Sequence, residues 1–196
     1  KNLFFNGGMK NSWISEETKG SSFSDVRLGR RYSKLIEQLS EGIGESIPMA
    51  CQDWANTKGA YRFFSNSRVT EDQILEGHFQ ASHHRCAAIK KERLLILHDT
   101  TEFSYQRENP MAIGITHKIP HRRVKTNRSH TVCGLLMHSS LVVTSSGLPL
   151  GLAAIKFWTR KKFKGSQALR KKICFTRIPI AEKESIRWIE NLKQST

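Results

Sequence analysis

The chain has 196 residues, enough for one large domain or two small ones, and 38% of them are hydrophobic. Lysine and arginine number 32 against 17 aspartates and glutamates, so the formal net charge is +15. This balance favours an anionic partner, with nucleic acid ahead of a membrane surface, although a basic fragment of a larger neutral protein would show it too.

Signals for membranes and export are the next feature of the sequence. No run approaches the roughly 18 apolar residues of a membrane span, and the apolar stretch within residues 1–8 is too short for a signal peptide. Met9 would make a natural start, so residues 1–12 are interpreted as an extension that precedes the folded domains. The sequence therefore predicts a cytoplasmic protein that does not enter a membrane.

The four cysteines are spread along the chain at Cys51, Cys86, Cys133 and Cys174. No two of them are close enough to form a Cys-x-x-Cys knuckle, which argues against a structural zinc site. A chain of this length does not need a disulfide scaffold either. We therefore expect free thiols in a reducing compartment.

The first half of the chain has a helical period. Asp25 is a good N-cap for a helix over residues 26–39. One side of this helix is apolar, through Leu28, Tyr32, Leu35 and Leu39. Four cations fall mostly on its other side, namely Arg27, Arg30, Arg31 and Lys34. Such a face is either ordinary solvated surface or a contact for DNA phosphates, and its lack of acids favours phosphate contact.

Two more helices are predicted before residue 92. The first covers residues 53–64, where Tyr61 and Arg62 could flank a sugar–phosphate backbone. The second is opened by a capping box at Thr70 and Gln73 and continues to about Lys90. Three histidines lie on it, at His78, His83 and His84. Adjacent residues point apart on a helix, so surface histidines are favoured over a metal site.

The period then changes to that of strands. Residues 93–98 read as a short strand that ends at Asp99, and residues 130–144 and 148–159 read as a hairpin. A helical period returns over residues 182–192. Two loops, 117–128 and 160–172, carry many cations and no acid, and the first includes Arg122, Arg123 and Lys125. They are either solvated loops or a track for a polyanion.

Asp99 is the strongest candidate for chemistry. An acid that follows a buried strand is well placed to hold a metal ion, and a basic protein around it suggests a polyanionic substrate. Phosphodiester chemistry commonly uses two divalent ions held by several carboxylates, one ion activating the nucleophile and the other stabilising the leaving oxygen. The alternative is a strand-end acid that caps backbone amides in a turn.

Three blocks of sequence together resemble one known family. They are Ser24-Asp25-Val26-Arg27 with Arg31, Gly59-Ala60-Tyr61-Arg62-Phe63-Phe64, and His98-Asp99-Thr100-Thr101-Glu102-Phe103-Ser104-Tyr105. Their order and spacing are similar to those of bacterial cut-and-paste transposases of the insertion-sequence-four family, transposon-five type. A later block, Glu182-Lys183-Glu184-Ser185 followed by Trp188, is similar as well. The resemblance covers the chain from about Trp13 onward.

The resemblance implies an α+β or α/β protein. A helical domain over residues 13–92 would bind the double-stranded ends of a transposon, through blocks that contain Arg27, Arg31, Tyr61 and Arg62. A catalytic domain with an RNase H-like fold would follow over residues 93–196. In that family a DDE triad holds two Mg²⁺ ions, for which Mn²⁺ can substitute, and Asp99 falls on the first aspartate. The complete protein would form a homodimer on DNA.

The chain departs from the family pattern at its end. The second aspartate and the glutamate of the triad would lie beyond Thr196, so we expect the first half of the RNase H-like core, with three strands and the start of a helix. Apolar strand faces and one sheet edge should then be exposed. Two hypotheses follow: the N-terminal part of a transposase that needs the remaining triad, or a catalytically inactive remnant that binds DNA. A basic protein unrelated to transposition is the weaker alternative.

Overall fold

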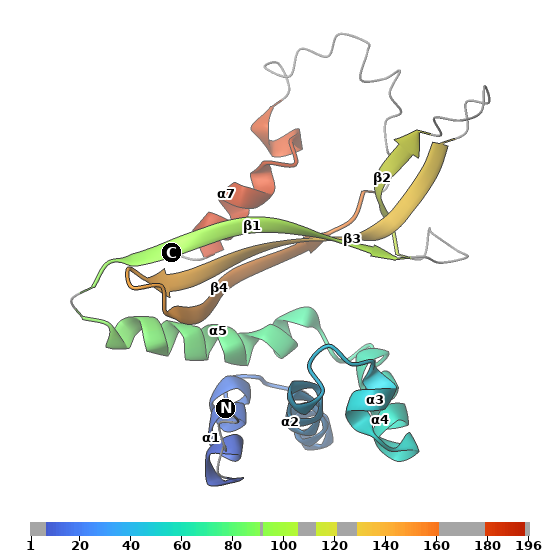
Figure 1. The fold of residues 1–196 in the computed structure, drawn as a ribbon, viewed down its shortest axis with the longest axis vertical. Helices are drawn as coiled ribbons and strands as arrows, with labels where there is room; N and C mark the ends of the chain where they lie inside the picture. The colour runs from blue at the N-terminus through green and yellow to red at the C-terminus, as the bar shows by residue number, and fades with distance from the viewer. Residues whose placement is uncertain (1–6, 91, 106–112, 121–128, 161–178, 195–196) are drawn as a thin grey trace, which may run out of the picture. The chain divides into compact units, whose positions relative to one another are not determined.

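A computed structural model describes residues 7–90, 92–105, 113–120, 129–160 and 179–194 (Figure 1). The chain divides into two compact units, residues 1–92 and 93–196. In the residues that the structure describes, the first unit contains helices and no strand, and the second contains an antiparallel sheet of four strands with a helix. The predicted α+β class is therefore confirmed, whereas α/β is not, because every pair among the described strands is antiparallel.

Five helices form the first unit: α1 (Gly7–Thr18), α2 (Val26–Glu41), α3 (Ile47–Cys51), α4 (Trp54–Phe64) and α5 (Glu71–Ala88). Helices α2, α4 and α5 confirm the three helices that the sequence predicts. Helices α1 and α3 were not predicted. Helix α1 crosses residue 12, where the sequence placed the end of an extension.

Side chains at the N-termini explain where the predicted helices begin. The Asp25 carboxylate accepts a hydrogen bond from the amide of Arg27 at 2.8 Å, and the Asp53 carboxylate accepts one from the amide of Asn56 at 2.7 Å. Thr70 and Gln73 form the reciprocal bonds of a capping box at the start of α5. Each cap satisfies amides that have no partner within the helix, and this local chemistry fixes the helix starts.

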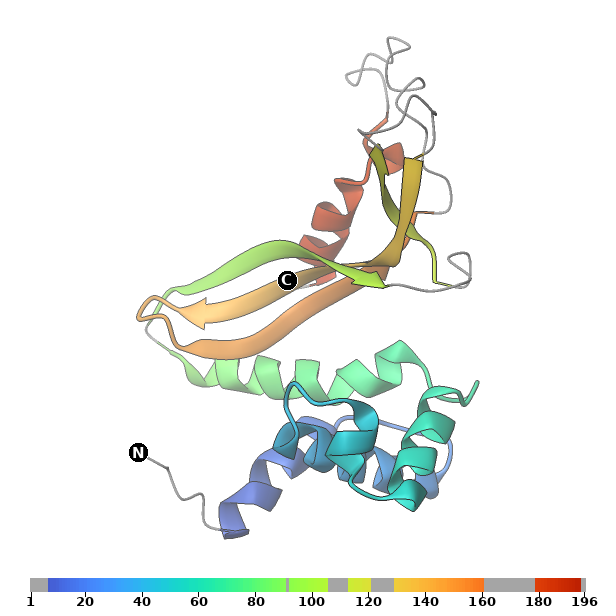
Figure 2. The same ribbon diagram turned by 45° about the vertical axis from the view of Figure 1, so that its right-hand side comes forward.

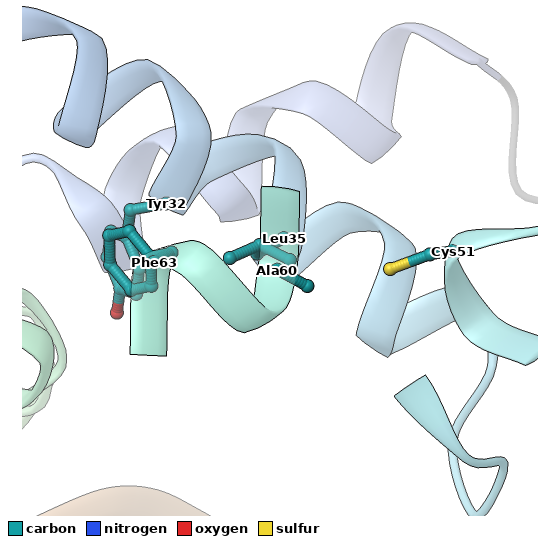
Figure 3. Packing of buried hydrophobic residues seen from close by; sticks show 5 residues of the cluster. All are labelled: Tyr32, Leu35, Cys51, Ala60 and Phe63. Carbon is teal, nitrogen blue, oxygen red and sulfur yellow. The ribbon is translucent and has the colours of Figure 1, made fainter. Parts of the chain in front are cut away.

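The core of the helical unit lies where α2 and α4 meet (Figure 3). Its buried residues are Tyr32, Leu35, Cys51, Ala60 and Phe63. The rings of Tyr32 and Phe63 stack with their centroids 6.0 Å apart. The Tyr32 hydroxyl donates a hydrogen bond of 2.6 Å to the carbonyl oxygen of Ile74 in α5. One tyrosine therefore joins three helices, and the predicted apolar stripe of α2 is confirmed.

Helix α1 packs against α5 at a glycine. A Cβ atom placed on Gly77 would lie 2.3 Å from the carbonyl oxygen of Glu17, so only glycine allows the two backbones to approach this closely. Beside this contact, Glu17 forms ion pairs with His78 and Arg85. The His78 side chain is therefore 30% exposed and paired with Glu17, whereas His83 and His84 are exposed as predicted.

The second unit is a sheet of β1 (Leu94–Tyr105), β2 (Ile115–Pro120), β3 (Ser129–Thr144) and β4 (Pro149–Trp158). The long strand β3 is central: β1 pairs along one edge of it, and β2 and β4 pair along the other. Helix α7 (Ile186–Gln194) follows a short 3-10 turn and packs on one face of the sheet (Figure 2). The predicted hairpin, β3 to β4, and the predicted C-terminal helix are both confirmed.

Two predictions about strands need correction. Strand β1 does not end before Asp99 but continues to Tyr105, pairing with β3 from Leu94 opposite Thr144 to Tyr105 opposite Cys133. Threonine, phenylalanine and tyrosine after Asp99 suit a strand, and a partner of 16 residues lets them pair. The predicted loop 117–128 likewise begins as part of β2.

A matched pair of glycine variants tests the α1–α5 contact. Gly77→Ala should destabilise the protein by about 1–3 kcal/mol, because its methyl group meets a backbone carbonyl that cannot move aside. Gly29→Ala, also inside a helix, meets its nearest atom at an ordinary 3.8 Å. It should stabilise by about 0.5–1 kcal/mol. Denaturant unfolding measures both, and a stabilising Gly77→Ala would contradict the close approach.

Candidate nucleic-acid interface

The cations of α2 lie on one side of the helix. Arg27, Arg30 and Lys34 are exposed, whereas Tyr32 and Leu35 are buried against α4. Because residues three and four apart share a helix face, the exposed cations form a continuous basic stripe. A groove of about 520 Å³ opens beside its first half, lined among others by Lys19, Ser22, Arg30 and Ser33. This stripe is the side of α2 that is open to a ligand.

Arg31 is placed differently from the other three cations. It is half-buried, and its guanidinium donates a hydrogen bond of 3.2 Å to the side-chain oxygen of Asn56 in α4. A Cβ atom at Gly59 would lie 2.6 Å from the central carbon of this guanidinium, so Arg31 rests on the bare backbone of α4. Arg31 therefore joins the two helices at the border of the basic stripe.

The outer face of α4 is both aromatic and basic. Tyr61 and Arg62, predicted as DNA contacts, are exposed on it. Trp54 and Lys58 share this face, because positions 54, 58, 61 and 62 fall on one side of a helix whose other side buries Ala60 and Phe63. The sequence analysis missed Trp54 and Lys58. Their helical spacing from Tyr61 and Arg62 could have indicated that they lie on the same face.

Helices α2 and α4 run antiparallel, which brings the two faces together. Phe23, just before α2, lies 5.7 Å from Phe63 near the end of α4, and Arg31 reaches Asn56 near its start. Lys34 acts electrostatically on the Asp53 carboxylate at the beginning of α4. The bonded amide of Asn56, with a smaller contribution from Lys34, holds the pKa of Asp53 below its usual value. The basic stripe of α2 thus borders the outer face of α4; we call the two together the α2–α4 surface.

The remaining predicted DNA contacts lie in the other unit. Arg122, Arg123 and Lys125 fall outside the described residues. Of the predicted basic loop 160–172, only Arg160 is described, and its guanidinium is paired with the Glu184 carboxylate, with one N···O distance of 2.7 Å. Arg160 also donates to the carbonyl oxygen of Thr116. Arg160 therefore has a structural role between β2, β4 and the start of α7.

Asp99 lies in the middle of β1, opposite Ser139 of β3. Side chains alternate between the faces of a strand, and His98 and Thr100 point to the face that α7 covers, so Asp99 points to the opposite face. Its carboxylate is exposed there beside the side chains of Leu95 and Leu97, which are about half exposed. The alternative of a strand-end acid in a turn is thereby wrong.

The described residues do not complete a metal centre around Asp99. Within the ranges that the structure describes, no three histidine, cysteine, aspartate or glutamate side chains come together as metal ligands. Asp99 can therefore supply one ligand, and the residues described do not by themselves hold an ion. Cys51, Cys86 and Cys133 are free thiols, as predicted, whereas Cys174 lies outside the described residues.

Helix α7 docks on the sheet through buried polar groups. The Nδ1 atom of His138 lies 2.7 Å from the Thr100 hydroxyl, and its ring stacks on His98 and contacts Trp188. The side-chain amide of Asn191 donates to the carbonyl oxygen of His138 and to the Ser140 hydroxyl. Burial lowers the pKa of His138, and the neighbouring His98 lowers it further. Burial in the α7 contact therefore favours the neutral form of His138.

A comparison with known protein families finds a match within the first unit. Residues 10–69 match the family model of the transposase DNA-binding domain. The match contains all of α2, α3 and α4, and with them every cation and aromatic residue of the α2–α4 surface. It supports a transposase-related DNA-binding function for the helical unit, with DNA as the partner. No curated protein matches the chain.

A membrane was the second anionic partner that the charge allowed. In the described ranges, none of the helices has the length and apolar character that crossing a bilayer requires.

The buried His138 makes the stability of the sheet unit depend on pH. The ordinary pKa of a histidine is 6.5, and the pKa of His138 in the folded protein is lower. Below about pH 6.5 the unfolded state therefore binds more protons, and the free energy of unfolding falls. Above that pH the contribution is fully present. We expect the melting temperature to fall between about pH 7.5 and 5.5, and His138→Gln to reduce this fall.

His84→Gln is the matched control, because His84 is exposed on α5. This variant should keep the pH dependence of the unmodified protein. An unchanged melting temperature across the pH range, or a fall in His138→Gln as large as in the unmodified protein, would show that the buried His138 does not cause the pH dependence.

Proposed function

We propose that this chain binds double-stranded transposon-end DNA through the cations of the α2–α4 surface. The observation that carries the proposal is that the match to the transposase DNA-binding domain contains this whole surface. Arg27, Arg30 and Lys34 on α2 would contact phosphates, and Lys58 and Arg62 on α4 would extend the track. Phosphate contacts of this kind supply most of the affinity of such interfaces and make it dependent on salt.

The side chains around these cations favour the same assignment. Arg31 is held by Asn56 and Gly59, which keeps two basic helix faces in a fixed relation. The Asp25 and Asp53 carboxylates bind helix amides as N-caps. Their negative charges therefore lie at the N-termini of α2 and α4, and the stripe itself remains basic. A rigid basic surface of this kind suits a duplex better than a merely solvated helix face does.

We propose further that the protein is a cut-and-paste transposase of the insertion-sequence-four family, in which Asp99 is the first carboxylate of a DDE triad. The blocks around Arg31, Gly59 and Asp99 support it, as does an antiparallel sheet with β3 between β1 and β4, the strand order expected of the first half of an RNase H-like core. Asp99 would hold Mg²⁺, which activates a nucleophile for strand cleavage. Two further carboxylates would have to come from outside the described residues. A homodimer on paired ends is part of this proposal.

The alternative is a DNA-binding remnant without catalytic activity. It shares the α2–α4 surface with the first proposal and differs only at Asp99. The absence of a three-ligand group within the described part of the chain is the observation that favours it.

Binding to duplex DNA tests the α2–α4 surface. We expect affinity to fall steeply as salt rises, and each of Arg27→Ala, Lys34→Ala and Arg62→Ala to reduce the salt slope by about 1. Lys90→Ala removes an equal charge beyond the end of α5 and serves as the control. An affinity that barely changes with salt, or equal losses in Lys90→Ala, would contradict the assignment. Fluorescence anisotropy with a labelled duplex measures these quantities.

Strand cleavage tests whether this chain alone holds a complete catalytic site. The 196-residue polypeptide alone should not nick transposon-end DNA in Mg²⁺ or Mn²⁺, because Asp99 lacks further carboxylates among the described residues. Nicking that disappears in Asp99→Ala would show that the chain holds a complete site. Asp72→Ala, which removes an acid from the first turn of α5, is the matched control in a nicking assay on supercoiled DNA.

A further inference from the structure

Helix α4 exposes three large aromatic side chains, Trp54, Tyr61 and Phe64, and a duplex-binding surface does not require the first two. Trp54 is 77% exposed and Tyr61 is 52% exposed, and both lie on its outer face. Between and beside them are the cations Lys58 and Arg62. Isolated apolar side chains are common on protein surfaces, but a tryptophan and a tyrosine with two cations on one helix face form a patch of defined chemistry.

The backbone holds Trp54 outward. Trp54 is the first residue of α4, directly after the N-cap Asp53. Gln52 before it has φ of 62°, a left-handed conformation that a residue with a side chain rarely adopts, and this turns the chain sharply from α3 into α4. Side chains in a helix lean toward its N-terminus, so the indole stands beyond the first turn of α4. Met49 of α3 is exposed near the same turn.

The spacing of the two rings matches stacked nucleotides. Seven residues of helix separate Trp54 and Tyr61, which corresponds to about 10 Å along the axis. Three steps of a stacked strand cover about the same length. Lys58, between the rings in sequence, and Arg62, one residue after Tyr61, can contact the phosphates of that strand. Aromatic rings flanked by cations at this spacing are how proteins bind bases that are not paired.

Bases inside an intact duplex cannot stack on these rings, because each base is stacked between its neighbours and only its edges are accessible in the grooves. A flat indole on the outside of a helix can stack on a base that has left the duplex stack. The basic stripe of α2 remains available to the paired DNA next to it. Charge and ring chemistry therefore point to DNA that is duplex on one side and unpaired on the other.

We infer that the outer face of α4 binds unpaired bases next to the duplex held by α2, with Trp54 and Tyr61 as the stacking rings. The inference rests on the proposed DNA binding and adds to it a preference for DNA with a single-stranded gap or extension. Trp54 and Tyr61 give the surface this preference, and Lys58 and Arg62 give it affinity irrespective of pairing.

Affinities for two DNAs of equal length test the inference, one a continuous duplex and one carrying a short single-stranded gap. Wild-type protein should bind the gapped DNA more tightly. Trp54→Ala should lose about 10-fold on the gapped DNA and change little on the duplex. Lys58→Ala should weaken binding to both DNAs equally. Circular dichroism and the retained duplex affinity show that Trp54→Ala is folded.

Tryptophan fluorescence gives a second measurement. Stacking on a base should quench the emission of Trp54 on the gapped DNA, and the quenching should persist in Trp13→Phe and disappear in Trp54→Phe. Equal affinities of wild-type protein for the two DNAs, or an equal loss by Trp54→Ala on both, would overturn the inference. Quenching that Trp54→Phe retains would overturn it too. An absence of any duplex binding by wild-type protein would instead contradict the proposed function.

Discussion

The packing of α2 against α4 is the interaction on which the helical unit depends. Tyr32 and Leu35 from one helix meet Ala60 and Phe63 from the other, and the absence of side-chain bulk at Ala60 lets the axes come close. A helix that buries one stripe must present the opposite stripe to solvent. The core thus decides which cations face outward. It also sets the antiparallel direction, so that the basic stripe and the outer face of α4 form one surface.

The sheet unit differs from the helical unit in that its two faces carry different kinds of side chain. The α7 face of the sheet carries His98, Thr100, His138 and Ser140 beside the buried Leu136 and Val142, and Asn191 of α7 bonds to it. The hydrogen bonds of this contact define the position of the helix closely. The opposite face carries Asp99 among exposed leucines. Along β1, from Leu94 to Tyr105, pairing within the described residues occurs only with β3.

Local chemistry made part of this structure predictable. Asp25, Asp53 and Thr70 indicate where helices begin, because a cap side chain accepts a hydrogen bond from an amide two or three residues away. The remainder depends on partners distant in the chain. Strand β1 is long because β3 is long, which no window around Asp99 reveals. Arg31 reads as one of four surface cations, yet a glycine 28 positions later receives its guanidinium. Trp54 was missed because it is the first residue of α4, and the sequence around it indicates where the helix begins rather than which side of the helix is exposed.

The blocks that resemble transposases therefore mix two kinds of residue. Asp25, Arg31, Gly59 and Phe63 build the helix pair, whereas Arg27, Tyr61 and Arg62 face outward from it. The block around Glu184 and Trp188 likewise serves α7, through Arg160 and His138. Asp99 is unlike these structural residues. Its carboxylate makes no hydrogen bond or ion pair with the residues that the structure describes, and its place in mid-strand removes any capping role. A charge beside half-exposed leucines gains nothing for folding, and that is the physical reason behind the proposal that Asp99 is a metal ligand.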